Sequence, residues 1–473
     1  MATEYDNMIN DLRGRLSARQ SLLQENDSYY DAKKRLTSIG IATPPEMRAL
    51  LVAVGWPRIY IDAIEQRMDV EGFRLAGKSG SDDRLWEWWQ ANDMDVEAGI
   101  GHIEALIHGI AYCSVSAPDP SNPLVDPSVP LYRVESPFDM IADVDPVTRK
   151  VKSALRLTGQ TAGVARDNTG TLSLEPVTAT LLLPDRTVVV DLDSQGRSST
   201  RLEIPHRLGV VPVVPIVNRP RARAHARAGQ SEILTELRSI TDAACRLLMN
   251  MSAVAELMAV PQRLLFGVAQ EALTANPNDP GSVLEAYMAR IIAIEDSEAH
   301  AFQWVAAELQ NFVNALSELS KHAVAYTGLP QSYLGNATDN PVSAEALKAS
   351  EERIVKMAER KSTLFGSAWE QVNRLGMLVM GEKIPSEAFR LETMWRDPST
   401  PTYAAKADAV TKMFNTGNGL IPKEQARIDM GYSEEARRQM REWDQESPIQ
   451  QLATLYKVPD APSLREGAPG QVA

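Results

Sequence analysis

The chain has 473 residues, a formal net charge of -13 at pH 7 and 44% hydrophobic residues. This length favours two or three domains with sizeable cores, and the composition excludes a disordered protein. Because sequence-independent binding to nucleic acid needs many Lys and Arg side chains on one surface, the acidic balance argues against a protein that grips DNA through a basic exterior.

The cysteines and the N-terminus indicate where the chain is made. Only Cys113 and Cys245 are present, so the chain has no disulfide framework and synthesis in a reducing cytoplasm is expected. The N-terminal sequence MATEYDNMINDLRGRL is charged and lacks an apolar stretch of signal-peptide length. No window approaches the roughly 18 consecutive apolar residues of a membrane span, and we expect no membrane contact.

Helical spacing of apolar residues predicts that the N-terminal region is mainly α-helical. Gly55, Trp56 and Pro57 are expected to break the helical pattern. The clustered tryptophans Trp86, Trp88 and Trp89 are expected to pack in a core. The predicted helices cover residues 5–30, 46–54, 59–68, 85–92 and 95–109, and the predicted strands cover 70–75 and 110–116.

The composition then turns to β-formers separated by Gly, Pro, Asp and Asn. We expect a small β-rich domain over residues 131–215. Its predicted strands cover residues 131–134, 140–144, 153–158, 171–174, 179–183, 187–192, 201–204 and 210–217.

A basic stretch, residues 219–227, joins the β region to a long helix. It is consistent with phosphate contact, or with a solvated linker or salt bridges to an acidic neighbouring subunit. The absence of interleaved aromatic residues favours the second interpretation.

The first long helix is predicted from an N-cap at Ser231 to a stop before Pro261. At 1.5 Å per residue it spans roughly 28 residues, or about 42 Å. Apolar residues recur at steps of three and four, among them Leu234, Leu237, Ile240, Leu247 and Met251. A rod of this length overhangs an ordinary domain, so we expect its apolar stripe to pack against identical copies.

A small module, residues 261–304, separates this helix from a second one over 306–327. The module is predicted to contain strands at 263–266, 290–294 and 301–304, a turn-rich segment at 276–281 and a short helix at 282–289. The second helix has Leu309, Phe312 and Leu316 on its apolar side, and Gly328 at its C-cap position.

A polar loop, residues 329–342, precedes a third helix from Ser343 to Met380, roughly 38 residues or about 57 Å. Gly366 and Gly376 inside it are expected kink points, each unfavourable by about 1 kcal/mol relative to Ala. A strand at 389–395 and helices at 403–415, 423–430 and 433–446 are predicted beyond it. The Pro/Gly-rich tail from Pro459 is expected to be disordered.

One sequence motif is typical of nucleotide-hydrolysing enzymes. Residues 72–79 match the phosphate-loop pattern, in which Lys78 and Ser79 would engage phosphate and Mg²⁺. Such a loop opens directly into a helix, whereas here Asp82 and Asp83 intervene and would repel phosphate. Asp191, at the end of an apolar strand, resembles the Mg²⁺-binding acid of such enzymes. It lies among strands that look antiparallel, however, and not in the alternating strand-helix units of those enzymes. A strand with a surface turn is the favoured interpretation.

Sequence patterns for other catalytic or metal-binding sites are weak. Residues 191–196 begin like a calcium loop, but Leu202 replaces its twelfth-position Glu. No histidines occur four residues apart, and His102 and His108, six apart, are expected to be packed or exposed singly. We therefore expect no enzyme, no metal site and no cofactor.

Several stretches together resemble portal proteins of long-tailed double-stranded DNA phages, in particular those of phages that infect actinobacteria. Their order and joint spacing along nearly the whole chain make the resemblance specific. They are GWPR at 55–58, RMDVEGF at 67–73, LWEWWQAN at 85–92, GQSEI at 229–233, SAEAL at 343–347 and WRDP at 395–398.

The resemblance implies an α+β, mainly α, subunit of a ring, usually of twelve copies, at one capsid vertex of the virion, assembled in the host cytoplasm. The implied regions are N-terminal helices and a β-rich wing (1–228), a first stem helix (229–260), a clip (261–304), a second stem helix (305–328), a tunnel loop (329–342), a long wing helix with a β segment (343–400), a helical crown (401–458) and a tail (459–473).

By the same resemblance the ring conducts double-stranded DNA during packaging and ejection and helps to initiate capsid assembly. Its implied partners are the terminase large subunit, head-tail connector or adaptor proteins, and the major capsid and scaffolding proteins. The implied stem-packing residues are Leu234, Leu237, Ile240, Leu247, Met251, Leu309, Phe312 and Leu316. The implied clip docking surface is Asn276, Asn278, Asp279, Glu285, Arg290 and Glu295.

The implied tunnel loop offers hydrogen-bonding groups but no cation, unlike portals with a basic tunnel residue. Its residues are Gln331, Ser332, Tyr333, Leu334, Gly335, Asn336, Ala337, Thr338, Asp339 and Asn340. Twelve copies at -13 each give -156, so DNA is expected to slide with weak, salt-sensitive contacts. The alternatives are an ATPase that uses Lys78 and Ser79, and a helical adaptor that is not viral.

Overall fold

The computed structural model divides into two units, Met1–Ser399 and Thr400–Ala473. The described residues are 5–33, 52–78, 80–119, 121–160, 165–166, 172–173, 176–192, 198–222, 229–258, 263–266, 291–294, 301–303, 309–335, 344–399, 403–414, 419–432 and 434–445.

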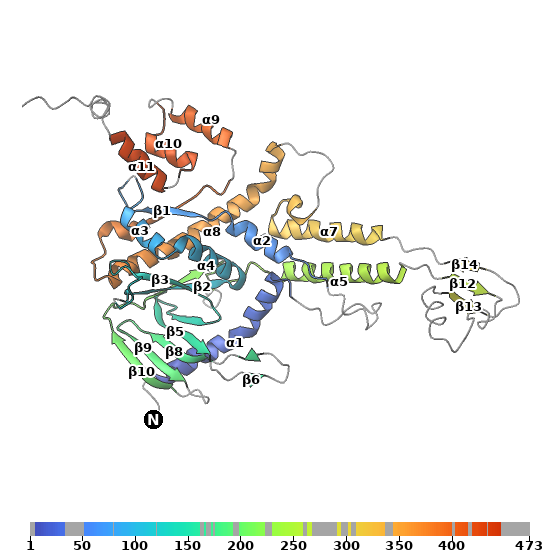
Figure 1. The fold of residues 1–473 in the computed structure, drawn as a ribbon, viewed down its shortest axis with the longest axis horizontal. Helices are drawn as coiled ribbons and strands as arrows, with labels where there is room; N and C mark the ends of the chain where they lie inside the picture. Colours follow the sequence, from blue (N-terminus) through green and yellow to red (C-terminus); the bar gives the residue numbers. More distant parts are fainter. Residues whose placement is uncertain are drawn as a thin grey trace, which may run out of the picture. The chain divides into compact units, whose positions relative to one another are not determined.

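In the first unit, helix α1 (Asp6–Tyr30) packs on a five-stranded antiparallel sheet (Figure 1). The helix buries Ile9, Leu12 and Leu16, which recur at helical spacing, against the inward Val188 and Val190 of the sheet. The strands lie in the order β10-β9-β8-β5-β4. They are β4 (Met140–Val144), β5 (Val151–Gln160), β8 (Pro176–Leu182), β9 (Arg186–Leu192) and β10 (Ser198–Pro205).

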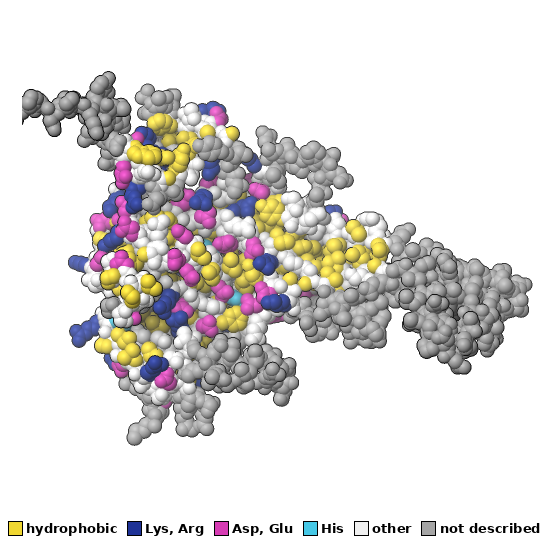
Figure 2. Space-filling view, in the orientation of Figure 1, with side chains coloured by type: hydrophobic (Ala, Val, Ile, Leu, Met, Phe, Trp, Pro, Cys, Tyr) yellow, Lys and Arg dark blue, Asp and Glu magenta, His cyan; other side chains and the backbone are white. Residues whose placement is uncertain are grey.

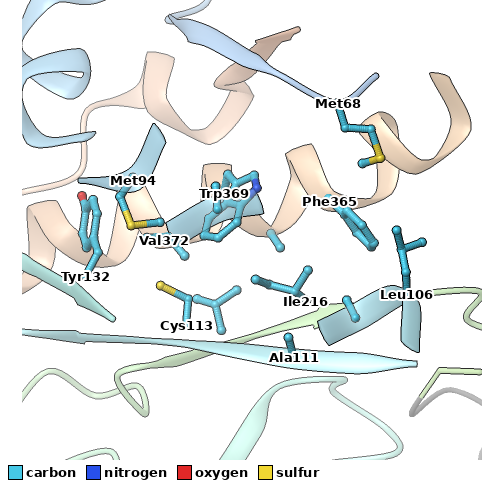
Figure 3. Close-up of a cluster of buried hydrophobic side chains, with 14 of the residues drawn as sticks. Met68, Met94, Leu106, Ala111, Cys113, Tyr132, Ile216, Phe365, Trp369 and Val372 are labelled. Carbon is cyan, nitrogen blue, oxygen red and sulfur yellow. The ribbon is translucent and has the colours of Figure 1, made fainter. Parts of the chain in front are cut away.

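A second sheet carries the largest core of this unit. It has the order β11-β2-β3 and is antiparallel, with β2 (Ile110–Ser116), β3 (Leu131–Glu135) and β11 (Val213–Val217). Helices α4 (Met94–His108) and α8 (Ala344–Val379) pack on it. Figure 3 shows Phe365, Trp369 and Val372 of α8 pointing toward Cys113 and Ile216 of the sheet, and all five side chains are buried.

Two short helices and a long-range strand pair complete this core. They are α2 (Trp56–Glu65), α3 (Asp83–Ala91), β1 (Val70–Arg74) and β15 (Glu392–Trp395), with the 3-10 helix η5 (Ser386–Arg390) just before β15. Strands β1 and β15 are antiparallel, with Val70 opposite Trp395. Trp89 packs edge-on against Phe73 at 5.2 Å and Trp369 at 5.3 Å, which confirms core packing for the tryptophan cluster.

Helices α5 (Thr235–Met258) and α7 (Gln310–Thr327) lie side by side (Figure 1). Between them in sequence lie β12 (Arg263–Phe266), β13 (Ile291–Ile294) and β14 (Ala301–Gln303), which form a sheet in the order β13-β12-β14. The 3-10 helix η4 (Gln331–Leu334) follows α7, and the short strands β6 (Ala165–Arg166) and β7 (Leu172–Ser173) form a separate pair.

The second unit contains α9 (Tyr403–Phe414), α10 (Lys423–Met430) and α11 (Glu434–Gln445). Helix α10 packs on both of its neighbours. Arg427 of α10 lies 2.6 Å from Asp444 of α11, and Arg441 of α11 lies 2.7 Å from Glu424 of α10, so charged pairs connect these two helices.

Most of the predicted elements are present, with four corrections. Helix α2 begins at Trp56 and not near Ile59, because Pro57 is well suited to a first turn, where its missing N–H is not needed. Helix α5 begins at Thr235, so Ser231 is not its N-cap. The predicted strand 389–395 is a strand only from Glu392. Residues 46–51, 282–289 and 459–473 lie outside the described residues, and 52–54 are not helical.

Candidate functional site

Helices α5 and α7 share an apolar seam. Ile240 and Leu316, both predicted for this packing, lie in a cluster with Ala244, Cys245 and Ala323. Of the other predicted residues, Leu237 belongs to the main core, Leu247, Met251 and Phe312 are half-buried like Ile240 and Leu316, Leu234 precedes α5, and Leu309 precedes α7. The two helices therefore pair within one chain, through small residues that let them approach closely.

Part of the apolar side of α7 is uncovered in the single chain. Val313 is 49% exposed, Tyr326 is 56% exposed and Leu309, just before the helix, is 38% exposed. Figure 2 shows hydrophobic side chains gathered along α7 on the face in view. Large exposed apolar side chains that follow one helix are typical of a protein contact surface.

The segment after α7 is anchored to the body of the chain. Tyr333 of η4 accepts a hydrogen bond from Arg67 Nη2 at 3.0 Å and donates one to Glu351 Oε1 at 3.2 Å. Leu334 packs on the adjoining cores, whereas Gln331 and Ser332 are exposed. Because Tyr333 and Leu334 face inward, only part of this segment is available to a ligand.

A buried carboxylate, Glu232, connects three distant segments. It accepts hydrogen bonds from Arg219 Nε at 2.7 Å, Tyr60 Oη at 3.0 Å and Asn218 Nδ2 at 3.1 Å, and it contacts Lys361 Nζ of α8. Burial opposes ionisation, but the charges of Lys361 and Arg219 outweigh it and hold the pKa of Glu232 below its usual value. Sequence reasoning missed this cluster, since its partners come from distant parts of the chain.

The phosphate-loop pattern does not form a phosphate loop. Gly72 lies inside β1, which pairs with β15. Lys78 is paired with Asp82 at 3.2 Å, and Asp82 accepts a hydrogen bond from Leu85 N as the N-cap of α3. The lysine is therefore neutralised beside an acidic helix start, where phosphate would be repelled. Ser79 lies outside the described residues.

The histidines of α4 are packed. His102 is buried, and its Nε2 accepts a hydrogen bond from Trp369 Nε1 at 2.9 Å. Burial lowers the pKa of His102 to about 3, so the ring is neutral at physiological pH. His108 is also buried, with Nε2 3.1 Å from Asp27 Oδ1. In the described part of the chain no three His, Cys, Asp or Glu side chains gather as metal ligands would.

Comparison with known proteins decides the family. A family model described as "Phage portal protein, SPP1 Gp6-like" matches residues 11–450. The chain is 47% identical to the portal protein of Mycobacterium phage L5 over 453 residues, which cover 95% of this chain and 90% of that protein. It is also 47% identical to the portal protein of Mycobacterium phage D29 over 449 residues, covering 94% of this chain and 90% of the relative. The chain belongs to the phage portal protein family.

Among solved structures, the portal protein is similar to a chain in the neck of a native gene transfer agent particle computed with C12 symmetry, with 11% identity and a TM-score of 0.39. That match covers 85% of this chain and 98% of the other. A chain in the virion of a native gene transfer agent particle also has 11% identity and a TM-score of 0.39, with coverages of 86% and 98%.

As a portal protein, the chain is a structural component of the phage virion and not an enzyme. This excludes the ATPase and the non-viral adaptor as functions. Within the described residues, no helix combines the length and the apolarity needed to cross a bilayer.

Two groups of predicted portal residues fall partly or wholly outside the described residues. Residues 331–335 of the predicted tunnel loop are described, whereas Asn336, Ala337, Thr338, Asp339 and Asn340 are not. The predicted clip docking residues Asn276, Asn278, Asp279, Glu285, Arg290 and Glu295 also lie outside them.

Proposed function

We propose that this portal protein forms a ring of twelve subunits whose channel conducts double-stranded DNA into the capsid during packaging and out of it during ejection. The observation that carries the proposal is the 47% identity to portal proteins over 95% of the chain. The exposed apolar side chains of Leu309, Val313 and Tyr326 support it, because identical neighbours in a ring would cover them.

In this proposal the helical and β regions take the roles expected of a portal subunit. Helices α5 and α7 are the stem, strands β12 to β14 belong to the clip, and α9 to α11 are the crown. The clip docks the terminase large subunit and later the head-tail connector proteins. Contacts with the major capsid and scaffolding proteins initiate capsid assembly.

The proposed contact between the channel and DNA is weak because the exposed side chains are uncharged. Gln331 and Ser332 are exposed and neutral, and the hydroxyl of Tyr333 is already used inside the chain. With no cation from these residues and a chain charge of -13, DNA meets hydrogen-bonding groups and a like-charged assembly. Such contacts allow sliding and are sensitive to salt.

The ring is tested by the mass and the end-on image of the purified protein. Twelve copies of the 52.0 kDa chain have a mass of about 624 kDa. We expect light scattering to give a mass of this order and class-averaged electron micrographs to show a closed ring with a central hole. A stable monomer at every concentration would overturn the proposal.

The channel role is tested by replacing residues 336–340 with Gly and Ser, a change that leaves the Tyr333 anchor in place. We expect normal rings with impaired packaging or retention of DNA. The matched control is Tyr333→Phe, which removes the anchor and leaves the length of the loop unchanged. Loss of the ring on replacing residues 336–340 would show that the loop is a subunit contact.

A further inference from the structure

A strongly basic cleft lies between α8 and the segment that follows β11. Its volume is about 790 Å³. Its cationic lining residues, which together define the basic cleft, are Arg219, Arg221, Arg353, Lys356, Arg360 and Lys361. The four from α8 recur at helical spacing, so one face of the helix forms one wall.

Carboxylates within the chain do not balance the basic cleft. Arg219 and Lys361 share the single carboxylate of Glu232, and Lys356 pairs with Glu359 at 2.7 Å. Arg353 donates to the backbone oxygen of Ala325 at 3.0 Å. In the described part of the chain, neither Arg221 nor Arg360 has a carboxylate partner. The described lining of the basic cleft thus has six cations and no carboxylate of its own, an excess of positive charge within a chain of charge -13.

We infer that the basic cleft receives a carboxylate-bearing segment of a second copy of this chain, an inference that rests on the proposed ring. In a ring of identical subunits each contact is between two different surfaces, so a basic cleft at such a contact would meet a different surface of the next copy. The chain has 62 Asp and Glu against 49 Lys and Arg, so that surface has carboxylates to offer. Arginine binds carboxylates through two parallel hydrogen bonds.

The lining favours a protein segment over the DNA backbone. Met357, Leu364 and Pro220 add apolar surface to the basic cleft, and Leu364 is 38% exposed. Among its described lining residues there is no Phe, Tyr or Trp, so these residues offer no surface on which bases would stack. Mixed apolar and arginine surface is typical of protein interfaces.

The first test is the double charge reversal Arg221→Glu with Arg360→Glu. Both side chains are exposed, so the subunit should keep its unfolding midpoint. We expect the concentration for half-maximal ring assembly to rise by about tenfold or more, as attraction at each contact becomes repulsion. The matched control is Lys348→Glu, which reverses a charge on α8 at an exposed position outside the basic cleft.

The second test identifies the occupant. Rings assembled from mixed unlabelled and ¹⁵N-labelled copies are treated with a carbodiimide, which joins a lysine to a carboxylate in direct contact. We expect mixed-label cross-links from Lys356 to an Asp or Glu of another copy. Cross-links from Lys356 confined to Glu359 of the same copy would overturn the inference.

Two other results would separate failure of this inference from failure of the proposed function. If wild type forms rings and the double variant assembles equally well but retains DNA less tightly, the basic cleft binds phosphate and the inference is wrong, while the proposed function stands. If wild type forms no ring, the proposed function fails and the inference fails with it.

Discussion

Glu232 shows how one charged residue fixes the start of a long helix. Its side chain is fully buried, and the cations of Arg219 and Lys361 stabilise its charge. The contact with Lys361 spans 129 positions in the sequence. Ser231 and Glu232 look like the start of a helix, but the chain uses Glu232 for this cluster and the helix begins at Thr235. No local pattern reveals such a choice.

Glu232→Gln is expected to destabilise the subunit by about 3–5 kcal/mol, because two cations would be left near a neutral amide. Lys361 has a side chain only 6% exposed, so water cannot replace the lost carboxylate. The measurement is the free energy of unfolding by denaturant. Glu236→Gln, at an exposed position of α5, is the control and should change stability by less than about 0.5 kcal/mol. Similar values for the two variants would contradict this account.

His102 is expected to make the subunit sensitive to acid. Its pKa is lowered from 6.5 to about 3 by burial, so the unfolded chain binds a proton that the folded chain excludes. Stability is therefore complete above about pH 6.5 and is lost as the pH falls from there toward 3. Between pH 7 and pH 5 this single group should remove about 2 kcal/mol.

The check is His102→Gln, which keeps an acceptor for Trp369 but does not titrate. The difference in unfolding free energy between pH 7 and pH 5 should shrink by about 2 kcal/mol. His322→Gln, at an exposed position of α7, should leave the difference unchanged. An unaltered pH dependence in His102→Gln would show that His102 takes up its proton in the folded state.

At the scale of elements, periodicity alone predicts most of the fold. The strands at 110–116 and 140–144 and the helix at 423–430 match their predicted bounds, because each has a regular apolar pattern between clear breakers. The role of the glycines in α8 was not predictable. A Cβ at Gly366 would lie 3.1 Å from Trp395 Nε1, and one at Gly376 would lie 2.5 Å from Tyr132 Oη, so both allow close packing.

Gly376→Ala is expected to destabilise the subunit despite the better helix propensity of Ala. Tyr132 is buried and its hydroxyl lies 3.3 Å from Asn373 Oδ1, so it cannot move away easily. A packing loss of about 1–3 kcal/mol should outweigh the gain of about 1 kcal/mol from propensity. Gly14→Ala in α1, where nothing lies within 4 Å of the added atom, should stabilise by about 0.5–1 kcal/mol. Thermal unfolding should move in opposite directions for the two variants.

At the scale of the whole molecule, the prediction of a subunit rests on apolar surface that one chain leaves uncovered. The sequence predicts long helices with apolar stripes, but it does not separate the residues buried in the seam of α5 and α7 from the apolar residues of α7 that stay exposed. Both have similar residues at similar spacing. Leu309, predicted for the seam, is 38% exposed, whereas Ala323 and Cys245 are buried in it.

Val313→Glu should prevent or weaken ring assembly while leaving the single subunit folded. Val313 is 49% exposed, so a charge there is solvated in the monomer but would be desolvated against a neighbour. The mass from light scattering should fall from that of the ring toward 52.0 kDa. Asn314→Glu, at the next exposed position, is the control for added charge. Normal rings with Val313→Glu would place the subunit contact elsewhere.

The pairing of β1 with β15 also limits when the nascent chain can fold on the ribosome. Glu71 and Arg396, which join beside this strand pair, are 325 positions apart. The main core cannot close before residue 396 leaves the exit tunnel, yet α5 and α7 emerge earlier with their apolar sides bare. During translation these helices are exposed to premature association, and chaperones of the host are the natural protection for them.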